Sequence, residues 1–169
     1  MNQADDVKDL VRRLDLRPHP EGGYYRETYR AAESIPAAGL PPRYAGPRSM
    51  GTAIIFLLPT GRHSRWHRLR SDEIWHFYAG APLELYDISA AGELRLTLLG
   101  EPLGNPSAVC QAVVPAGHWF AARPRPGGAF ALTGCTVAPG FDFQDFELAD
   151  NPGLCQAFQD HASLIRQLA

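Results

Sequence analysis

The chain has 169 residues, 45% of them hydrophobic and 20% charged, which is the composition of one soluble globular domain rather than of a disordered or fibrous protein. Its formal net charge of -2 offers no positive field for a phosphate backbone, so nucleic acid is not expected as a partner. The longest apolar run, residues 53–58, is too short to cross a membrane, and the acidic amino terminus does not resemble a secretory signal. We therefore expect a cytoplasmic protein whose three cysteines are free thiols.

Hydrophobic periodicity predicts a helix at each end of the chain. Between Val7 and Leu14 apolar residues recur at spacings of three and four, which is typical of an amphipathic helix within residues 1–17. Near the other end, Asn151 is a favourable N-cap, because Pro152 follows it at the first helical position. One apolar stripe then predicts a single second helix over residues 151–168.

Residues 24–148, between the helices, have the pattern of an all-β domain. Ten segments have strand composition: 24–29, 52–58, 65–69, 73–78, 83–88, 94–98, 109–114, 119–122, 130–137 and 143–148. They are short, separated by Gly, Pro, Asp and Asn, and spaced roughly every ten residues, which predicts an antiparallel sandwich or barrel. The lack of helices between them excludes a Rossmann or TIM-barrel arrangement. Residues 35–51 are the one long irregular segment, a surface loop or a lid, and we favour the loop.

Histidine, tryptophan and arginine are concentrated in residues 61–80, GRHSRWHRLRSDEIWHFYAG. Four of these residues have the spacing of the first conserved motif of the cupin superfamily: Gly61, His67, Glu73 and Gly80. Pro115 and Gly117 resemble the second cupin motif. The positions at which these two motifs carry their other histidines are Leu69 and Phe120 here.

The chain also resembles one group within that superfamily, cupin-5 or DUF985. Four segments resemble its signatures in the same order: HPEGGYYRETYR, HRLRSDEIWHFYAG, VVPAG and GCTVAPGFDFQDFELAD. This resemblance implies one cupin domain, a jelly-roll β-barrel (double-stranded β-helix) with short terminal helices. It also implies a homodimer, because proteins of this group are usually dimeric. It implies no settled activity.

The motif residues could provide only part of the usual cupin metal-ligand set. The superfamily's metal set needs three histidines and one glutamate around one ion, and two of those four positions are apolar here. We therefore favour no cofactor. A divalent metal is possible if His118 joins His67 and Glu73, since two histidines and a carboxylate resemble the site of non-haem iron enzymes.

A metal-free pocket uses the same residues differently. His67, held by Glu73, would be a general base with a raised pKa, Tyr24 or Tyr25 could return the proton, and Arg65 could hold an anionic group. This resembles the logic of metal-independent cupin sugar epimerases. The predicted function is an isomerase or epimerase acting on a small polar or anionic ligand, such as a sugar or nucleotide derivative. A non-catalytic ligand-binding or storage cupin and a metal-dependent cupin enzyme are the alternatives.

Further side chains are expected around the pocket. Glu21 lies on a turn whose glycines permit a close backbone approach, and strand alternation groups Arg26 with Tyr24 on one face. Trp75 and Phe77 share a face with Glu73, where both core packing and ligand contact stay open. The predicted ligand-binding set is Glu21, Arg26, Arg65, Trp75, Phe77, His118 and Phe120.

Overall fold

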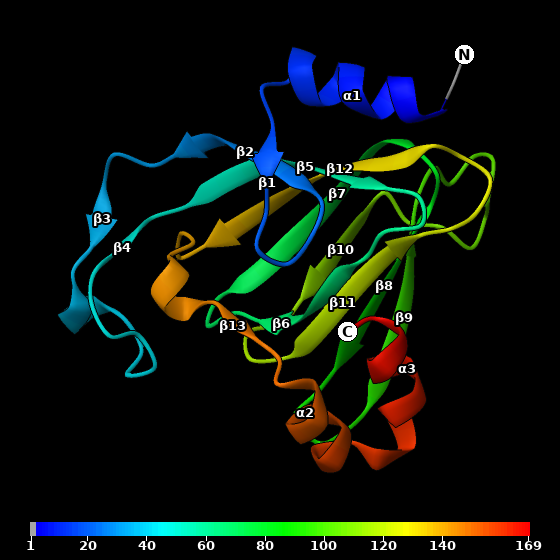
Figure 1. The fold of residues 1–169 in the computed structure, drawn as a ribbon. Coiled ribbons are helices and arrows are strands. Elements are labelled where there is room, and N and C mark those ends of the chain that lie inside the picture. Colours follow the sequence, from blue (N-terminus) through cyan, green and yellow to red (C-terminus); the bar gives the residue numbers. More distant parts are fainter. Residues whose placement is uncertain (1–2) are drawn as a thin grey trace.

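Two antiparallel β-sheets face each other across the hydrophobic core, in a computed structural model that describes residues 3–169 (Figure 1). The larger sheet contains, in spatial order, β1 (Arg17–Pro18), β2 (Tyr24–Arg30), β5 (Thr52–Pro59), β12 (Phe130–Ala138), β7 (Asp72–Gly80) and β10 (Gln111–Val114). The smaller contains β13 (Glu147–Leu148), β6 (Ser64–Arg68), β11 (Trp119–Pro124), β8 (Leu83–Ile88) and β9 (Leu94–Leu99). A separate ribbon pairs β3 (Ser34–Ile35) with β4 (Arg48–Ser49). The predicted all-β architecture is confirmed.

The core lies where the inner faces of the two sheets meet. The larger sheet contributes Phe56, Leu58 and Trp75, and the smaller contributes Leu85 and Phe120, each 1% exposed. Side chains alternate along each strand, so every second residue of a strand enters this layer. Removing these large apolar side chains from water is the main stabilising contribution to the fold.

Helices flank the barrel at both ends of the chain. They are α1 (Gln3–Arg13), α2 (Asn151–Ala157) and α3 (Ala162–Gln167), with single 3-10 turns η1 (Ala37–Gly39), η2 (Phe143–Asp145) and η3 (Gln159–His161). None of the helices within residues 3–169 combines the length and apolar character that a bilayer crossing requires. The predicted amino-terminal helix is confirmed by α1.

The single carboxyl-terminal helix was predicted wrongly. The chain leaves helical geometry at Phe158, where φ is -128° and ψ is 67°, and η3 separates α2 from α3. The N-cap is also one residue earlier than predicted, because the Asp150 carboxylate accepts a hydrogen bond from the Gly153 N–H at 3.2 Å. The break lets Leu154 of α2 and Ile165 of α3 pack in one cluster with Trp66 on the outer face of the smaller sheet.

Residues 35–51 are fixed to the barrel. The Tyr44 hydroxyl lies 2.9 Å from the Ser71 hydroxyl. The Arg48 guanidinium donates two hydrogen bonds of 2.7 Å to the Asp145 carboxylate, and both side chains are 3% exposed. None of residues 35–51 lines the cavity described below, which favours the surface loop over the lid.

Candidate functional site

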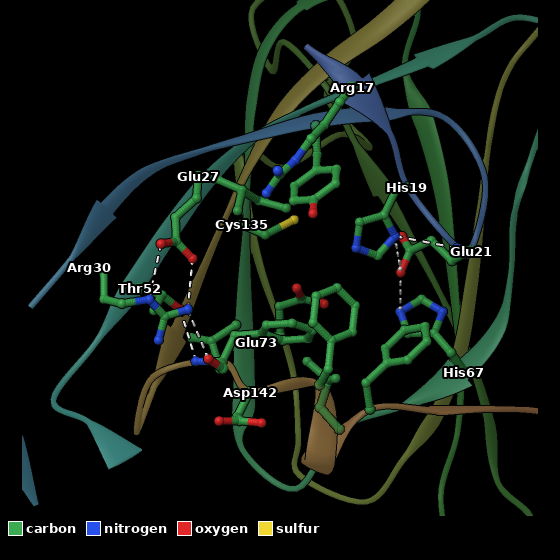
Figure 2. Close-up of a pocket in the computed structure, with 17 residues that line it drawn as sticks. Arg17, His19, Glu21, Glu27, Arg30, Thr52, His67, Glu73, Cys135 and Asp142 are labelled. Carbon is green, nitrogen blue, oxygen red and sulfur yellow. Dashed lines mark hydrogen bonds and ion pairs between the residues drawn. The ribbon is translucent and has the colours of Figure 1, made fainter. Parts of the chain in front are cut away.

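A cavity of about 330 Å³ lies between the inner face of the larger sheet and the segment that runs through η2 (Figure 2). Strands β2, β5, β7 and β12 form one wall, and β6 with the aromatic residues Phe141, Phe143 and Phe146 forms the other. Five ionisable side chains of the lining are largely buried: His19, Glu21, His67, Glu73 and Cys135. Two of them, Glu21 and Glu73, are buried carboxyl groups, which are uncommon unless they are paired or functional.

His67 and Glu21 form a hydrogen-bonded pair at the inner end of the cavity. The Nδ1 atom of His67 lies 2.6 Å from the Arg65 carbonyl oxygen, which can only accept, so Nδ1 carries the proton in the neutral ring. Its Nε2 atom, left as an acceptor, lies 3.0 Å from Oε2 of Glu21. The other oxygen of Glu21 accepts a hydrogen bond from the Ser64 hydroxyl at 2.9 Å.

The proton between Nε2 and Oε2 belongs to the carboxyl group of Glu21. Burial raises the pKa of Glu21 well above its usual value, and the nearby carboxylate of Glu73 raises it further. Burial also lowers the pKa of His67 to about 3. Near neutral pH the pair is therefore a protonated carboxyl group that donates to a neutral imidazole.

His19 joins this pair from the turn that precedes β2. The Glu21 backbone N–H donates to Nδ1 of His19 at 3.3 Å, so the neutral ring carries its proton on Nε2. Figure 2 shows one ring nitrogen of His19 facing Glu21 and the other facing the cavity. Burial, and then the charge of Arg17, lowers the pKa of His19 to about 4, which keeps the ring a neutral hydrogen-bond donor.

Glu73 lies on β7, is 7% exposed and faces the cavity. Its Oε2 accepts a hydrogen bond of 2.9 Å from the Trp75 indole N–H, and the Cys135 thiol is a second partner. No arginine, lysine or histidine within residues 3–169 makes an ion pair with it. Burial raises the pKa of Glu73 to about 7, so both protonation states are populated at neutral pH.

Charged side chains surround the mouth of the cavity. Arg30 is neutralised by Glu27, to which it donates hydrogen bonds of 3.0 and 2.7 Å, and it also donates to the Phe141 carbonyl oxygen at 3.1 Å. Arg17 lies 4.9 Å from the centre of the Tyr25 ring. No carboxylate in the described part of the chain lies within ion-pair distance of Arg17.

The structure brings together three of the predicted site residues, Glu21, His67 and Glu73, but pairs them differently. The predicted hydrogen bond between His67 and Glu73 is wrong, because His67 bonds to Glu21 and Glu73 bonds to Trp75. The predicted rise in the pKa of His67 is also wrong, since burial outweighs the backbone hydrogen bond and lowers it. His19 was missed, although the segment HPEGG places it two residues before Glu21.

Tyr24 and Arg26 lie on the opposite face of β2 from the one predicted. The register places Tyr25 opposite Phe56, whose side chain enters the core, so Tyr25 and Glu27 face inward. These two line the cavity, and Tyr24 and Arg26 do not. The proton-returning role predicted for Tyr24 is therefore not supported by its position.

Arg65 was expected on the same face as His67, and a β-bulge separates them. Ser64 pairs with Ala122 and His67 with Phe120, so three steps along β6 match two along β11. Ser64 and His67 both face inward as a result, and Arg65 is exposed, donating to the Pro20 carbonyl oxygen at 2.5 Å.

The remaining predicted ligand contacts lie outside the cavity lining. His118 donates to the Asp87 carboxylate at 2.8 Å. Phe120 contacts the His67 ring with its own, at 4.0 Å between centroids, and Trp75 and Phe77 pack in or against the core. These aromatic residues therefore pack behind the side chains that line the cavity.

The residues at the cupin metal positions do not fit a metal ion. Leu69 and Phe120 provide no lone pair, and Nε2 of His67 already accepts the Glu21 proton. The alternative triad of His67, Glu73 and His118 is wrong, because His118 is held by Asp87. Within residues 3–169, no three or more His, Cys, Asp or Glu side chains are placed to hold a metal.

Comparisons with known proteins place the chain in one family. The model described as Cupin superfamily (DUF985) matches residues 8–149. A crystal structure of a protein from Shewanella oneidensis is 38% identical, with a TM-score of 0.84, covering 100% of this chain and 98% of that one. A hypothetical protein from Leishmania major is 32% identical, with a TM-score of 0.85, covering 96% and 97%. The search of curated proteins gives no match.

More distant structures confirm the jelly-roll fold. Bacillus subtilis oxalate decarboxylase has a TM-score of 0.55 at 15% identity, covering 92% of this chain and 38% of that one. One structure of that enzyme describes Mn(II) centres. At this identity the likeness shows the fold alone.

Proposed function

The chain belongs to the DUF985 family of the cupin superfamily, and we propose that its cavity binds a small molecule and moves a proton on it without a metal, as an isomerase or epimerase. The observation that carries this proposal is Glu73, a buried carboxyl group that faces the cavity, has no cationic partner among residues 3–169 and has a pKa of about 7. A general base is most effective when its pKa lies near the working pH. Glu73 thus replaces His67 as the proposed base.

The proposed reaction is abstraction of a proton from a carbon next to a carbonyl group. The Glu73 carboxylate takes that proton as the C–H bond breaks, and the electron pair moves onto the carbonyl oxygen. Where the carbon that loses the proton carries a hydroxyl group, the hydroxyl proton moves to the former carbonyl oxygen, and return of the abstracted proton from Glu73 to the former carbonyl carbon gives an isomer. Delivery to the opposite face of the same carbon, from the Glu21–His67 pair, gives an epimer.

The size of the cavity favours a sugar-sized ligand over a nucleotide. Taking roughly 30 Å³ for a water-sized group, 330 Å³ accommodates about eleven non-hydrogen atoms. A nucleotide has about twice that number and would extend past the rim. The cavity lies at the lower end of the volumes typical of small-molecule sites, roughly 300 to 1,000 Å³.

Deuterium exchange in D₂O reports the proposed proton abstraction whichever product is formed. We would incubate the protein with a panel of aldoses, ketoses, their phosphates and 2-oxo acids, and follow the C–H signals next to the carbonyl by NMR. The wild type should exchange at least one compound, and Glu73→Gln should slow this about 100-fold or more. Glu33→Gln, at an exposed position outside the cavity, is the matched control.

A non-catalytic binding protein is the second candidate, favoured by the two apolar residues at the cupin metal positions. It predicts saturable binding of a panel compound with no exchange above the buffer rate. Equal exchange by wild type and Glu73→Gln would also contradict the role proposed for Glu73.

We further propose that the chain forms a homodimer through the outer face of the larger sheet, and a cytoplasmic location stays a prediction. Tyr78 and Val113 support the dimer, because these large apolar side chains are 56% and 44% exposed on adjacent strands. A monomer mass by light scattering after gel filtration would contradict it.

A further inference from the structure

We infer that Arg17 and His19 form an anion-binding subsite at the mouth of the cavity, so that its ligand carries a carboxylate or a phosphate group. The inference rests on the proposed function in one respect, that the ligand occupies this cavity. It adds the chemical class of the ligand and the end of the cavity at which its charge lies.

Arg17 is an arginine of the cavity lining that pairs with no carboxylate among residues 3–169. Figure 2 shows the Arg17 guanidinium extending over the cavity, and its central carbon lies 4.9 Å from the centre of the Tyr25 ring. Arg30, the other arginine of the lining, already has both oxygens of Glu27 as partners. A guanidinium presents parallel N–H groups that match a carboxylate or phosphate, and Arg17 has these donors available.

His19 places a second donor beside Arg17. Its Nδ1 is occupied by the Glu21 N–H, so Nε2 carries the proton that faces the cavity. The charge of Arg17 contributes to the lowered pKa of His19, which agrees with their proximity and keeps the ring uncharged. One positive charge and one neutral N–H therefore converge at this end.

The other charges orient the ligand. Asp142, on the other side of the mouth, accepts a hydrogen bond of 2.9 Å from the Gln144 N–H and repels an anion from that side. Glu73 lies deeper and, when ionised, repels an anion from the inner end. The anionic group therefore belongs at Arg17, with the carbonyl end of the ligand directed towards Glu73.

Aromatic side chains indicate a flat or apolar body between these two ends. Phe143 is 53% exposed at the rim, and its ring lies 6.4 Å from that of His19 at an interplanar angle of 25°. Tyr25 and Phe146 contact His19 edge-on at 4.6 and 5.9 Å. A ligand body would cover the exposed ring of Phe143.

Three probes of similar size and different charge test the subsite: benzoate, phenyl phosphate and the uncharged benzamide. Binding is measured by isothermal titration calorimetry and by shifts of the His19 and Phe143 signals in NMR. We expect benzoate or phenyl phosphate to bind about tenfold or more tightly than benzamide, because one charge-assisted hydrogen bond changes the affinity by about this factor. Binding of benzoate alone would identify a carboxylate site, and of phenyl phosphate alone a phosphate site.

Variants separate the subsite from general electrostatic attraction. Arg17→Met should remove the preference for the anionic probe, and Arg17→Lys should retain part of it. Arg13→Met, an exposed arginine of α1 outside the cavity, should leave binding unchanged. Thermal melting of each variant checks that the barrel is intact.

The inference is overturned if benzamide binds as tightly as both anions, if no probe binds the wild type at millimolar concentration, or if Arg17→Met binds the anions like the wild type. Glu73→Gln distinguishes it from the proposed function. Glu73→Gln should keep the preference for anionic probes and lose deuterium exchange. The anion-binding subsite and the proposed proton abstraction can therefore be contradicted independently.

Discussion

Glu21 and His67 share one proton across 3.0 Å; the carbonyl oxygen of Arg65 fixes the tautomer of the His67 ring, and burial places the shared proton on Glu21. Because that carbonyl requires a proton on Nδ1, a neutral His67 presents a lone pair to Glu21. A buried carboxyl group then gains more by staying protonated and donating than by ionising without a cation. The same burial acts on Glu73, so the cavity contains two carboxyl groups that titrate far from their usual range.

The proton on Glu21 predicts that glutamine can replace it. In Glu21→Gln the new amide N–H would donate to Nε2 of His67, and the amide oxygen would accept from Ser64, as the protonated carboxyl does. Glu21→Gln should therefore change the free energy of unfolding little, whereas Glu21→Ala leaves both partners unsatisfied and should cost about 2 kcal/mol or more. Urea unfolding at pH 7 measures both. Similar losses in the two variants would indicate an ionised Glu21.

The raised pKa of Glu73 predicts a pH-dependent difference between the wild type and Glu73→Gln. Between about pH 4.5 and 7 the folded state keeps a proton on Glu73 that the unfolded state has lost, so rising pH favours unfolding. Relative to Glu73→Gln, the wild type should lose up to about 3 kcal/mol of stability across this range. Unfolding curves at several pH values measure this loss. A constant difference would show that Glu73 titrates normally.

His19 and His67 change the pH dependence of stability in the opposite direction to Glu73. With pKa values lowered to about 4 and about 3, His19 and His67 are neutral in the folded state and protonated in the unfolded state below about pH 6.5. Their contribution to stability is lost as the pH falls, while that of Glu21 and Glu73 is retained. From about pH 4.5 to 6.5 the carboxyl groups and the histidines should therefore oppose each other, and His19→Gln should make the stability measured by urea unfolding fall more steeply, or rise less steeply, with pH than in the wild type.

The absence of a fitting donor set within residues 3–169 predicts weak metal uptake. After reconstitution with Mn(II), Fe(II), Ni(II) and Zn(II), mass spectrometry of untagged protein should find less than one ion per chain, and melting temperature should not change after chelation. Stoichiometric metal that disappears in His67→Ala would contradict this prediction and would restore a metal-dependent reaction to consideration.

The buried ion pair between Arg48 and Asp145 predicts that the loop of residues 35–51 stabilises the η2 segment next to the cavity. Asp145 ends η2, whose Phe143 forms part of the aromatic wall. Arg48→Met removes both hydrogen bonds of the guanidinium to the buried Asp145 carboxylate, leaving Arg70 at 3.9 Å as its remaining cationic neighbour, and should cost about 3 kcal/mol. The double variant Arg48→Met with Asp145→Leu should recover part of this loss. Equal losses in both would mean that packing, rather than the unpaired charge, sets the cost.

The sequence by itself determined the architecture and two candidate site residues, His67 and Glu73. Strand-like segments at regular spacing predicted the two-sheet barrel, and the motif around His67 and Glu73, with apolar residues at positions 69 and 120, predicted a cupin without the full metal set. Such signals are local or periodic, because alternation along a strand and spacing within a motif are properties of the chain before it folds.

Only the tertiary structure decided which side chains meet. One bulge in β6 turns Arg65 out while keeping Ser64 and His67 inward, and the register of β2 selects Tyr25 over Tyr24. A shift of one residue moves a side chain to the other face of a sheet, and nothing within one strand records the pairing of its neighbours. The turn before β2 brings His19 and Glu21 to His67, across more than forty residues of sequence. Burial at that meeting point, and not the identity of the residues, is what reverses their usual protonation.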